Sequence, residues 1–191
     1  MIRILKEKEY ISQAWKNGQG STSQIAIHPK SAAFPEGSFA WRVSTAAITG
    51  KSSFSKFPGY QRILLVCGGH GILFNGKKQF PFIPILFSGD EDVDCSLVKD
   101  PVQDLGIIYD PKKVAVEVEI HTLKPKERAQ ILLEEGTHFL FNPVGSIQTP
   151  AGQLGPKDTL YVVDEEDDFE LDLSVTEITK LVRLSLFDLS F

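Results

Sequence analysis

The chain has 191 residues, of which 42% are hydrophobic and 24% charged, a balance typical of a folded globular protein. This balance excludes long disorder, collagen-like repeats and a coiled coil. The net charge of −5 provides no overall attraction for nucleic acid or for an anionic membrane, so we expect neither as a partner.

Most of the chain alternates apolar and polar residues between turn signals, which is the pattern of β-strands. In chain order, strands are predicted at residues 24–28, 39–48, 63–66, 72–74, 83–87, 93–98, 105–109, 114–120, 159–163 and 169–175. Asn75-Gly76 indicates a tight hairpin turn after residues 72–74. Many short strands at this spacing predict an all-β sandwich or barrel with few or no helices.

One segment, Lys126–Glu135, consists largely of helix-forming residues, so its composition alone favours a helix. An internal repeat favours a strand instead, because Ile63–Asn75 reappears, with one residue deleted, as Ile131–Asn142. The repeat makes residues 63–66 and 131–133 equivalent strands. Two copies of about 70 residues are too long and too few for a solenoid, so they predict a duplicated β-unit.

Acidic residues are concentrated near the C-terminus, where residues 158–191 hold ten of the 25 acids and only two bases. The run Asp164–Asp168 is typical of a solvated loop rather than of a tuned pair of carboxylates.

Two features bear on the cellular compartment. Cys67 and Cys95 form neither a metal-binding spacing nor a disulfide framework, which suits a reducing environment. The N-terminus is charged from the start, and no apolar stretch approaches the length of a membrane span. We therefore expect an unprocessed cytoplasmic protein.

Several short motifs follow one another along the first 110 residues. They are Trp15–Ala26, Phe39–Ile48, Phe54–Arg62, Phe87–Asp90 and Asp104-Leu105. In this order and spacing they resemble the HutD/Ves family, and a set of ordered motifs is far more specific than any single one. After residue 110 the similarity is mainly one of pattern.

The resemblance implies a cupin-like β-barrel duplicated in one chain, in agreement with the internal repeat. We expect an N-terminal barrel at residues 1–110 and a C-terminal barrel with an acidic end at 111–191; exchange of strands between the two is left open. The resemblance also implies a bacterial protein associated with histidine utilisation or stress response. Such a protein would bind a small acidic metabolite, such as formylglutamate, without catalysis and without a cofactor. A homodimer is left open.

The sequence departs from the family pattern at four places. Gln19 stands where a third glycine is usual, and Ser23-Gln24 stand where an Arg-Glu pair is usual. Gln61 replaces a common Asp, and Gly106 replaces an expected Asn.

The principal candidate for binding an acid is Arg42, because a guanidinium is a planar, two-pronged donor that matches a carboxylate. Alternation along a strand places Arg42 and Ser44 on one face, opposite Val43 and Thr45. We expect Arg42 to pair with the ligand carboxylate and Ser44 to add a hydrogen bond. The alternative is an arginine on an edge strand, either exposed to water or in a salt bridge.

The other ligand-binding candidates are Asn17, Trp41, Phe57 and Arg62. Asn17 would donate a further hydrogen bond, although its segment also fits a tight turn in which Trp15 closes a barrel end. Trp41 and Phe57 would form apolar walls, which are usual in metabolite sites. Arg62 is a second basic candidate, with a surface ion pair as its alternative.

A metal-dependent cupin enzyme, either an oxygenase or an isomerase, is the alternative function. No two of the four histidines are spaced His-x-His, so we assign no metal site and no catalytic residue. The best remaining constellation is Glu117, Glu119 and His121, which share one face of a predicted strand. Alternation with valines on the other face favours an ordinary solvent-facing surface there.

Overall fold

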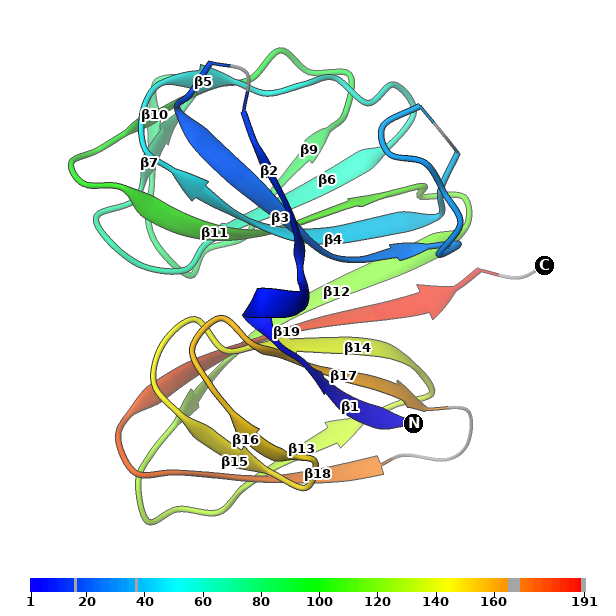
Figure 1. Cartoon of the computed structure of the whole chain (residues 1–191), viewed down its shortest axis with the longest axis vertical. Coiled ribbons are helices and arrows are strands. Elements are labelled where there is room, and N and C mark those ends of the chain that lie inside the picture. Colours follow the sequence, from blue (N-terminus) through cyan, green and yellow to red (C-terminus); the bar gives the residue numbers. More distant parts are fainter. Residues whose placement is uncertain (16, 37, 165–168, 190–191) are drawn as a thin grey trace. The chain divides into compact units, whose positions relative to one another are not determined.

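The structure is a computed structural model that describes residues 1–15, 17–36, 38–164 and 169–189 (Figure 1). Apart from one short 3-10 helix, Glu7–Glu9, the regular elements of these residues are β-strands, which confirms the predicted all-β class. In the described part of the chain, no helix is long and apolar enough to cross a membrane. The predicted acidic loop falls mainly on residues 165–168, which lie outside the described residues.

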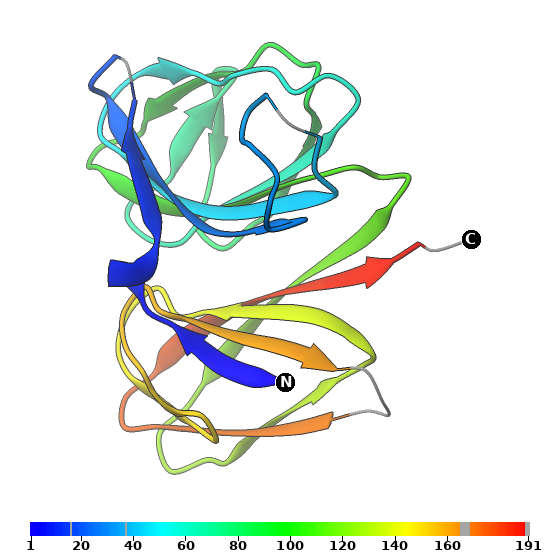
Figure 2. The ribbon, with the colours of Figure 1, turned by 45° about the vertical axis from the view of Figure 1, so that its right-hand side comes forward.

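The chain folds into two compact units. The N-terminal unit comprises residues 11–114, and the C-terminal unit comprises residues 1–10 and 115–191. The boundary therefore follows Val114 instead of residue 110, and the first ten residues belong with the C-terminal unit. Each unit consists of two antiparallel sheets, and Figure 2 shows the two sheets of each unit facing each other.

In the N-terminal unit, the large sheet has six strands in the order β2 (Ile11–Ala14), β3 (Gly20–His28), β4 (Trp41–Ile48), β11 (Val102–Tyr109), β6 (Gln61–Val66) and β9 (Ile85–Ser88). The small sheet has the order β5 (Ser52–Ser53), β10 (Asp94–Leu97), β7 (Ile72–Phe74) and β8 (Lys77–Gln79). Asn75 and Gly76 join β7 to β8 with φ angles of 47° and 76°, which confirms the predicted tight turn.

In the C-terminal unit, the large sheet has the order β1 (Ile2–Leu5), β17 (Thr159–Asp164), β14 (Gly136–Phe141), β19 (Thr179–Asp188) and β12 (Val114–Leu123). The small sheet has the order β13 (Ala129–Leu133), β18 (Phe169–Val175), β15 (Ile147–Thr149) and β16 (Gly152–Leu154). The segment Lys126–Glu135, whose composition favours a helix, thus contains strand β13, and the repeat predicted a strand there.

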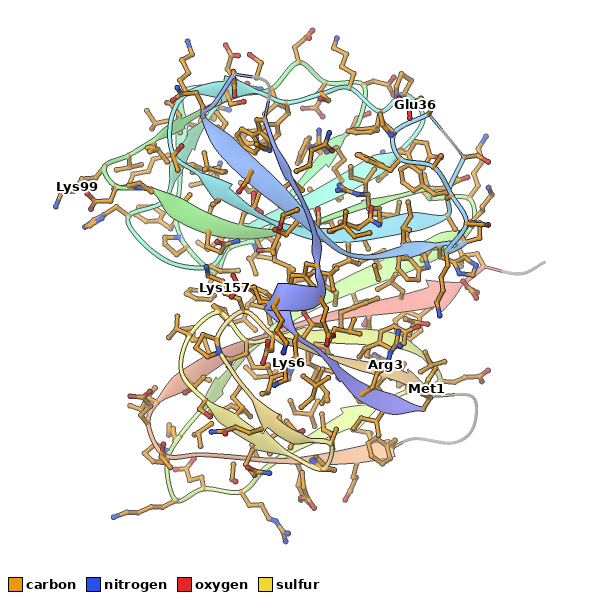
Figure 3. All side chains as sticks on the ribbon, viewed as in Figure 1. Met1, Arg3, Lys6, Glu36, Lys99 and Lys157 are labelled. Atoms are coloured by element: carbon orange, nitrogen blue, oxygen red, sulfur yellow. The ribbon has the colours of Figure 1, made fainter. Side chains whose placement is uncertain are left out.

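The first ten residues are fixed to this unit by charge and hydrogen bonds as well as by the pairing of β1 with β17. The ammonium of Lys6 lies 2.9 Å from Asp158 Oδ2, and the backbone N–H of Glu7 donates to Asp158 Oδ1 at 2.9 Å. Lys157 Nζ lies 3.2 Å from Glu7 Oε1. Figure 3 labels Lys6 and Lys157, which come from opposite ends of the sequence.

The strand orders confirm the duplication and correct its alignment. The order β4-β11-β6-β9 in one unit matches β12-β19-β14-β17 in the other, and β5-β10-β7-β8 matches β13-β18-β15-β16. Residues 63–66 in β6 therefore correspond to β14, so their predicted equivalence with residues 131–133 is wrong. Short apolar strands followed by glycine look alike in sequence, whereas the hydrogen-bonded neighbours distinguish them.

The interiors of the two units differ. In the C-terminal unit, a continuous cluster of apolar side chains joins the two sheets, with Leu140 and Leu160 of the large sheet completely buried. In the N-terminal unit, the buried apolar residues form two separate clusters, one around Val66 and Phe74 and one around Phe39 and Ile108. Polar side chains and a hollow occupy much of the remaining interior.

Candidate ligand-binding site

The N-terminal unit contains a cavity of about 600 Å³ on the inner face of its large sheet. Alternation along the strands determines which side chains enter it. The inward residues are Arg42, Ser44 and Ala46 of β4, Asp104, Gly106 and Ile108 of β11, and Arg62 and Leu64 of β6. Further residues of β2, β3 and β9 and of the segments before β3, β4 and β6 also line it.

Arg42 is only 7% exposed and is held by neutral partners. Its Nε donates to Gln24 Oε1 at 2.9 Å, and its Nη1 donates to Ser44 Oγ at 3.4 Å. The guanidinium carbon lies 3.8 Å from the centre of the Phe34 ring. Burial, and then the nearby charge of Arg62, lower the pKa of Arg42 to about 10, so it stays protonated at neutral pH.

Arg62 is the second cation of the cavity. Its Nη1 donates to the backbone oxygen of Ser55 at 2.9 Å. Its guanidinium lies 4.9–5.4 Å from the ring centres of Phe54, Phe57 and Phe87, within the range of cation–π attraction. Burial lowers its pKa to about 10, although the charge of Asp104 acts in the opposite direction. Among the described residues, no carboxylate forms an ion pair with either arginine.

Asp104 is the acidic residue of the lining and is 5% exposed. The backbone N–H of Ala46 donates to its Oδ1 at 2.8 Å. Burial raises the pKa of Asp104 to about 7, against the lowering effects of this hydrogen bond and of Arg62. The carboxyl is therefore divided between its neutral and charged forms near neutral pH, and the cavity keeps a net positive charge.

Gly106 provides space at the centre of the lining, between Ser44 of β4 and Leu64 of β6. A Cβ at this position would lie 3.6 Å from the backbone oxygen of Ile63 and 4.0 Å from that of Ser44, which are ordinary contacts. The backbone therefore has room for a Cβ at this position. The absence of a side chain here leaves space in the cavity.

Of the six ligand-binding candidates from the sequence, the cavity brings together Asn17, Arg42, Ser44, Phe57 and Arg62. Their contacts with a ligand remain predictions. Asn17 lies at the exposed rim, where its Nδ2 donates to Ser52 Oγ at 3.3 Å.

Trp41 is not part of the cavity lining, so its predicted role as a wall is wrong. The alternation that turns Arg42 inward turns Trp41 to the opposite face of β4. There its ring stacks on His28, with 5.7 Å between ring centroids. Trp15 lines the cavity, and its ring packs against Gly20, where a Cβ would lie 2.8 Å from ring atoms.

The metal-binding alternative rested on Glu117, Glu119 and His121, which β12 brings to one face in the C-terminal unit. Glu119 Oε1 lies 2.6 Å from Arg183 Nη2, so this carboxylate is engaged by a cation. Within the described ranges, no three His, Cys, Asp or Glu side chains are placed to hold a metal ion. Both cysteines are free and buried, and burial raises the pKa of the Cys95 thiol to about 12.

Sequence reasoning missed Asp104, Gln24 and Phe34 as lining or supporting residues. Asp104 gave a local signal, because it is the acid of a strand whose other residues are mostly apolar. Phe34 gave none, and Gln24 stood out only as a departure from the family pattern. The importance of both depends on contact with Arg42.

Comparison with known proteins places the chain in a family. The model of the HutD family matches residues 7–183. An uncharacterized 21.2 kDa protein in the hutC 3′ region of Pseudomonas putida is 32% identical over 151 residues, which cover 76% of this chain and 71% of the relative. Protein Ves of Citrobacter koseri is 26% identical over 151 residues, covering 75% and 71%.

Solved structures agree. PA5104 from Pseudomonas aeruginosa, described as a conserved protein of unknown function, superposes with a TM-score of 0.83 at 27% identity and covers 97% of this chain and 98% of its own. HutD from Pseudomonas fluorescens SBW25 superposes with a TM-score of 0.80 at 26% identity over the full length of both chains. YhhW from Escherichia coli, at 11% identity and a TM-score of 0.66 over 97% of both chains, shares the cupin-like fold alone. The chain therefore belongs to the HutD family and has the duplicated cupin-like β fold.

Proposed function

We propose that this protein is a non-catalytic binding protein for a small acidic metabolite. The observation that carries the proposal is the pair Arg42 and Arg62, two cations that line one cavity without a carboxylate partner among the described residues. Keeping a buried charge without a counter-charge is unfavourable, so these two arginines favour an anionic ligand.

The cavity lining indicates how an acid would be held. The planar fork of Arg42 suits one carboxylate, and Ser44 and Asn17 add donors nearby. Arg62 suits a second carboxylate, and Phe57 supplies an apolar wall. A volume of about 600 Å³ lies within the usual range for metabolite sites.

A dicarboxylate fits two arginines, so we take formylglutamate as the first candidate ligand. The family name and the hutC 3′ region of the Pseudomonas putida relative support a role in histidine utilisation. In this proposal the protein acts in the cytoplasm, with which two free thiols are compatible, and modulates the pathway by binding one of its acids.

Calorimetric titration with formylglutamate, glutamate and urocanate tests the proposal. We expect saturable binding of at least one acid and loss of that binding in Arg42→Gln. Binding should be strongest for formylglutamate, which has two carboxylates and lacks the ammonium group of glutamate. Absence of binding by all three acids at millimolar concentration, or equal binding by the variant, would contradict the proposal.

A further inference from the structure

Strand pairing arranges the polar groups of the N-terminal cavity in rows across the large sheet. Arg42 of β4 and Arg62 of β6 both pair with Ile108 of β11, so they lie in one row, two strands apart. Neighbouring strands are about 4.8 Å apart, which puts the two arginine Cα atoms about 10 Å from each other. Asp104 lies further along β11, with its Cα about 13 Å from that of Ile108, and lines the same cavity.

The row between the arginines and Asp104 contains open space. Gly106 is its central residue, between Ser44 and Leu64. A ligand held by both arginines can therefore extend past Gly106 toward Asp104. The cavity volume of about 600 Å³ lies in the range that accommodates drug-sized ligands, so it exceeds what a short dicarboxylate alone requires.

The Asp104 side chain is 5% exposed, and only one of its two oxygens has a partner. Oδ1 accepts a hydrogen bond from the backbone N–H of Ala46 at 2.8 Å. Among the described residues, Oδ2 forms no hydrogen bond and no ion pair. Buried polar groups are nearly always hydrogen-bonded, so Oδ2 indicates that a polar group of the ligand completes this end of the cavity.

The surroundings of Asp104 favour its neutral form when an anion is bound. Burial raises its pKa to about 7, although Arg62 acts to lower it. The thiols of Cys67 and Cys95 also feel the charge of Asp104, and burial keeps both neutral by raising their pKa values. A bound dianion adds negative charge and stabilises the protonated carboxyl further. Because Oδ1 already accepts a hydrogen bond, Oδ2 is the oxygen free to carry the proton and to donate.

We propose that Asp104 is a specificity-determining residue, whose Oδ2–H donates a hydrogen bond to a neutral acceptor oxygen of the ligand. This inference rests on the proposed function and names the ligand class more closely, as a dicarboxylate that carries an acyl-amino group. The carboxylates pair with Arg42 and Arg62, and the acyl oxygen faces Asp104. An acyl-amino group places its oxygen further from the carbon chain than a hydroxyl does, which suits the separation of Asp104 from the arginine row.

Calorimetric titration of the full-length protein with glutarate and with formylglutamate tests the proposal. Both acids have two carboxylates, and only formylglutamate has the acyl-amino group. At pH 6, the wild type should bind formylglutamate about tenfold more tightly than glutarate, as expected for a hydrogen bond to a buried group. Asp104→Leu, which cannot donate, should bind the two acids with similar affinity.

The matched variant is Asp104→Asn, because its amide can accept from the Ala46 N–H and donate from Nδ2 into the cavity. This variant should keep the preference for formylglutamate from pH 6 to pH 8. In the wild type the preference should decrease over this interval, as Asp104 ionises and loses its donor. General repulsion by the ionised carboxylate would act alike on both dianions and leave their affinity ratio unchanged.

Three results would overturn this proposal and leave the proposed function intact. They are equal affinity of the wild type for the two acids at pH 6, an undiminished preference in folded Asp104→Leu, and a preference in Asp104→Asn that falls with pH as in the wild type. Circular dichroism shows whether each variant keeps the fold, and the comparison of wild type with Asp104→Asn decides if the leucine variant does not. Binding of neither acid would overturn the proposed function and this proposal with it.

Discussion

The two units of this protein share a strand order but differ in the charge of the side chains on the inner face of their large sheets. In the N-terminal unit, the inward positions of β4 and β6 carry Arg42 and Arg62, and the cavity has a net positive charge. In the C-terminal unit, the corresponding strands bring Glu117 and His138 to a smaller hollow in which acids predominate. The comparison shows that the same strand order can carry inward side chains of opposite charge.

The largest expected effect on acid binding comes from removing the charge of Arg42, whose hydrogen-bond partners are neutral. Arg42→Gln should weaken binding of formylglutamate by at least about 30-fold, because it removes one side of a desolvated charge pair. The same variant should not lower the thermal stability of the ligand-free protein, since a buried charge without a counter-charge disappears. Calorimetry and thermal unfolding measure the two effects. Arg128→Gln, at a surface arginine of the other unit, is the control that should change neither.

Filling the space at Gly106 is the next test. Gly106→Leu should reduce affinity for the acid about tenfold or more, because the new side chain occupies ligand volume, while the fold accepts its Cβ. Gly68→Ala serves as a control, since a Cβ there meets nothing within 4 Å. Circular dichroism shows whether each variant keeps the fold, and calorimetry measures its affinity for the acid. Wild-type affinity in Gly106→Leu would show that the acid does not enter this part of the cavity.

A smaller effect on acid binding is expected from changing Gln24, the neutral hydrogen-bond partner of Arg42. Gln24→Glu places a carboxylate beside the guanidinium, 2.9 Å from Nε in the present geometry, and should reduce acid affinity about tenfold by supplying the missing counter-charge internally. Gln24→Met removes the hydrogen bond without adding charge. If both variants weaken binding equally, loss of the hydrogen bond explains the result and charge compensation does not.

The smallest effect concerns pH. Burial raises the pKa of Asp104 to about 7, so between pH 6 and 8 the carboxyl ionises and repels an anion. Affinity for formylglutamate should fall a few-fold over this interval, and Asp104→Asn should remove the slope. An unchanged slope in Asp104→Asn would assign the pH dependence to another group.

The same shift predicts how stability depends on pH. The folded protein binds the Asp104 proton more tightly than the unfolded chain does. This contribution to stability is fully present below about pH 4, the ordinary pKa of a carboxyl group, and is lost as pH rises through about 7. Urea unfolding of wild type and Asp104→Asn across this interval measures it.

Local pattern was sufficient for much of the fold. Alternation and turn residues predicted β4, β11 and the hairpin at Asn75-Gly76, and the repeat correctly favoured a strand at β13. The pattern did not reveal β19, the central strand between β14 and β12, because apolar residues lie on both of its faces and blur the alternation. The pattern also could not align the two copies, because the similar apolar strands β6 and β13 lie in a large sheet and a small sheet, respectively.

Single segments of the sequence predicted part of the lining, since Asn17, Phe57 and Arg62 were candidates from their own motifs. The shared face of Arg42 and Ser44 followed from alternation, and the same rule, applied to its neighbour, excludes Trp41. Asp104 and Arg62 enter the cavity because β11 and β6 lie beside each other, and this adjacency arises from long-range pairing. Gln24 became relevant only through its contact with Arg42.

The most direct test of the central claim is an NMR titration of the full-length ¹⁵N-labelled protein with formylglutamate. The positive charge of the cavity predicts saturable shifts of amides in β4, β6 and β11, and loss of these shifts in Arg42→Gln. If the acid shifts amides of the C-terminal unit instead, or shifts none, the account is contradicted.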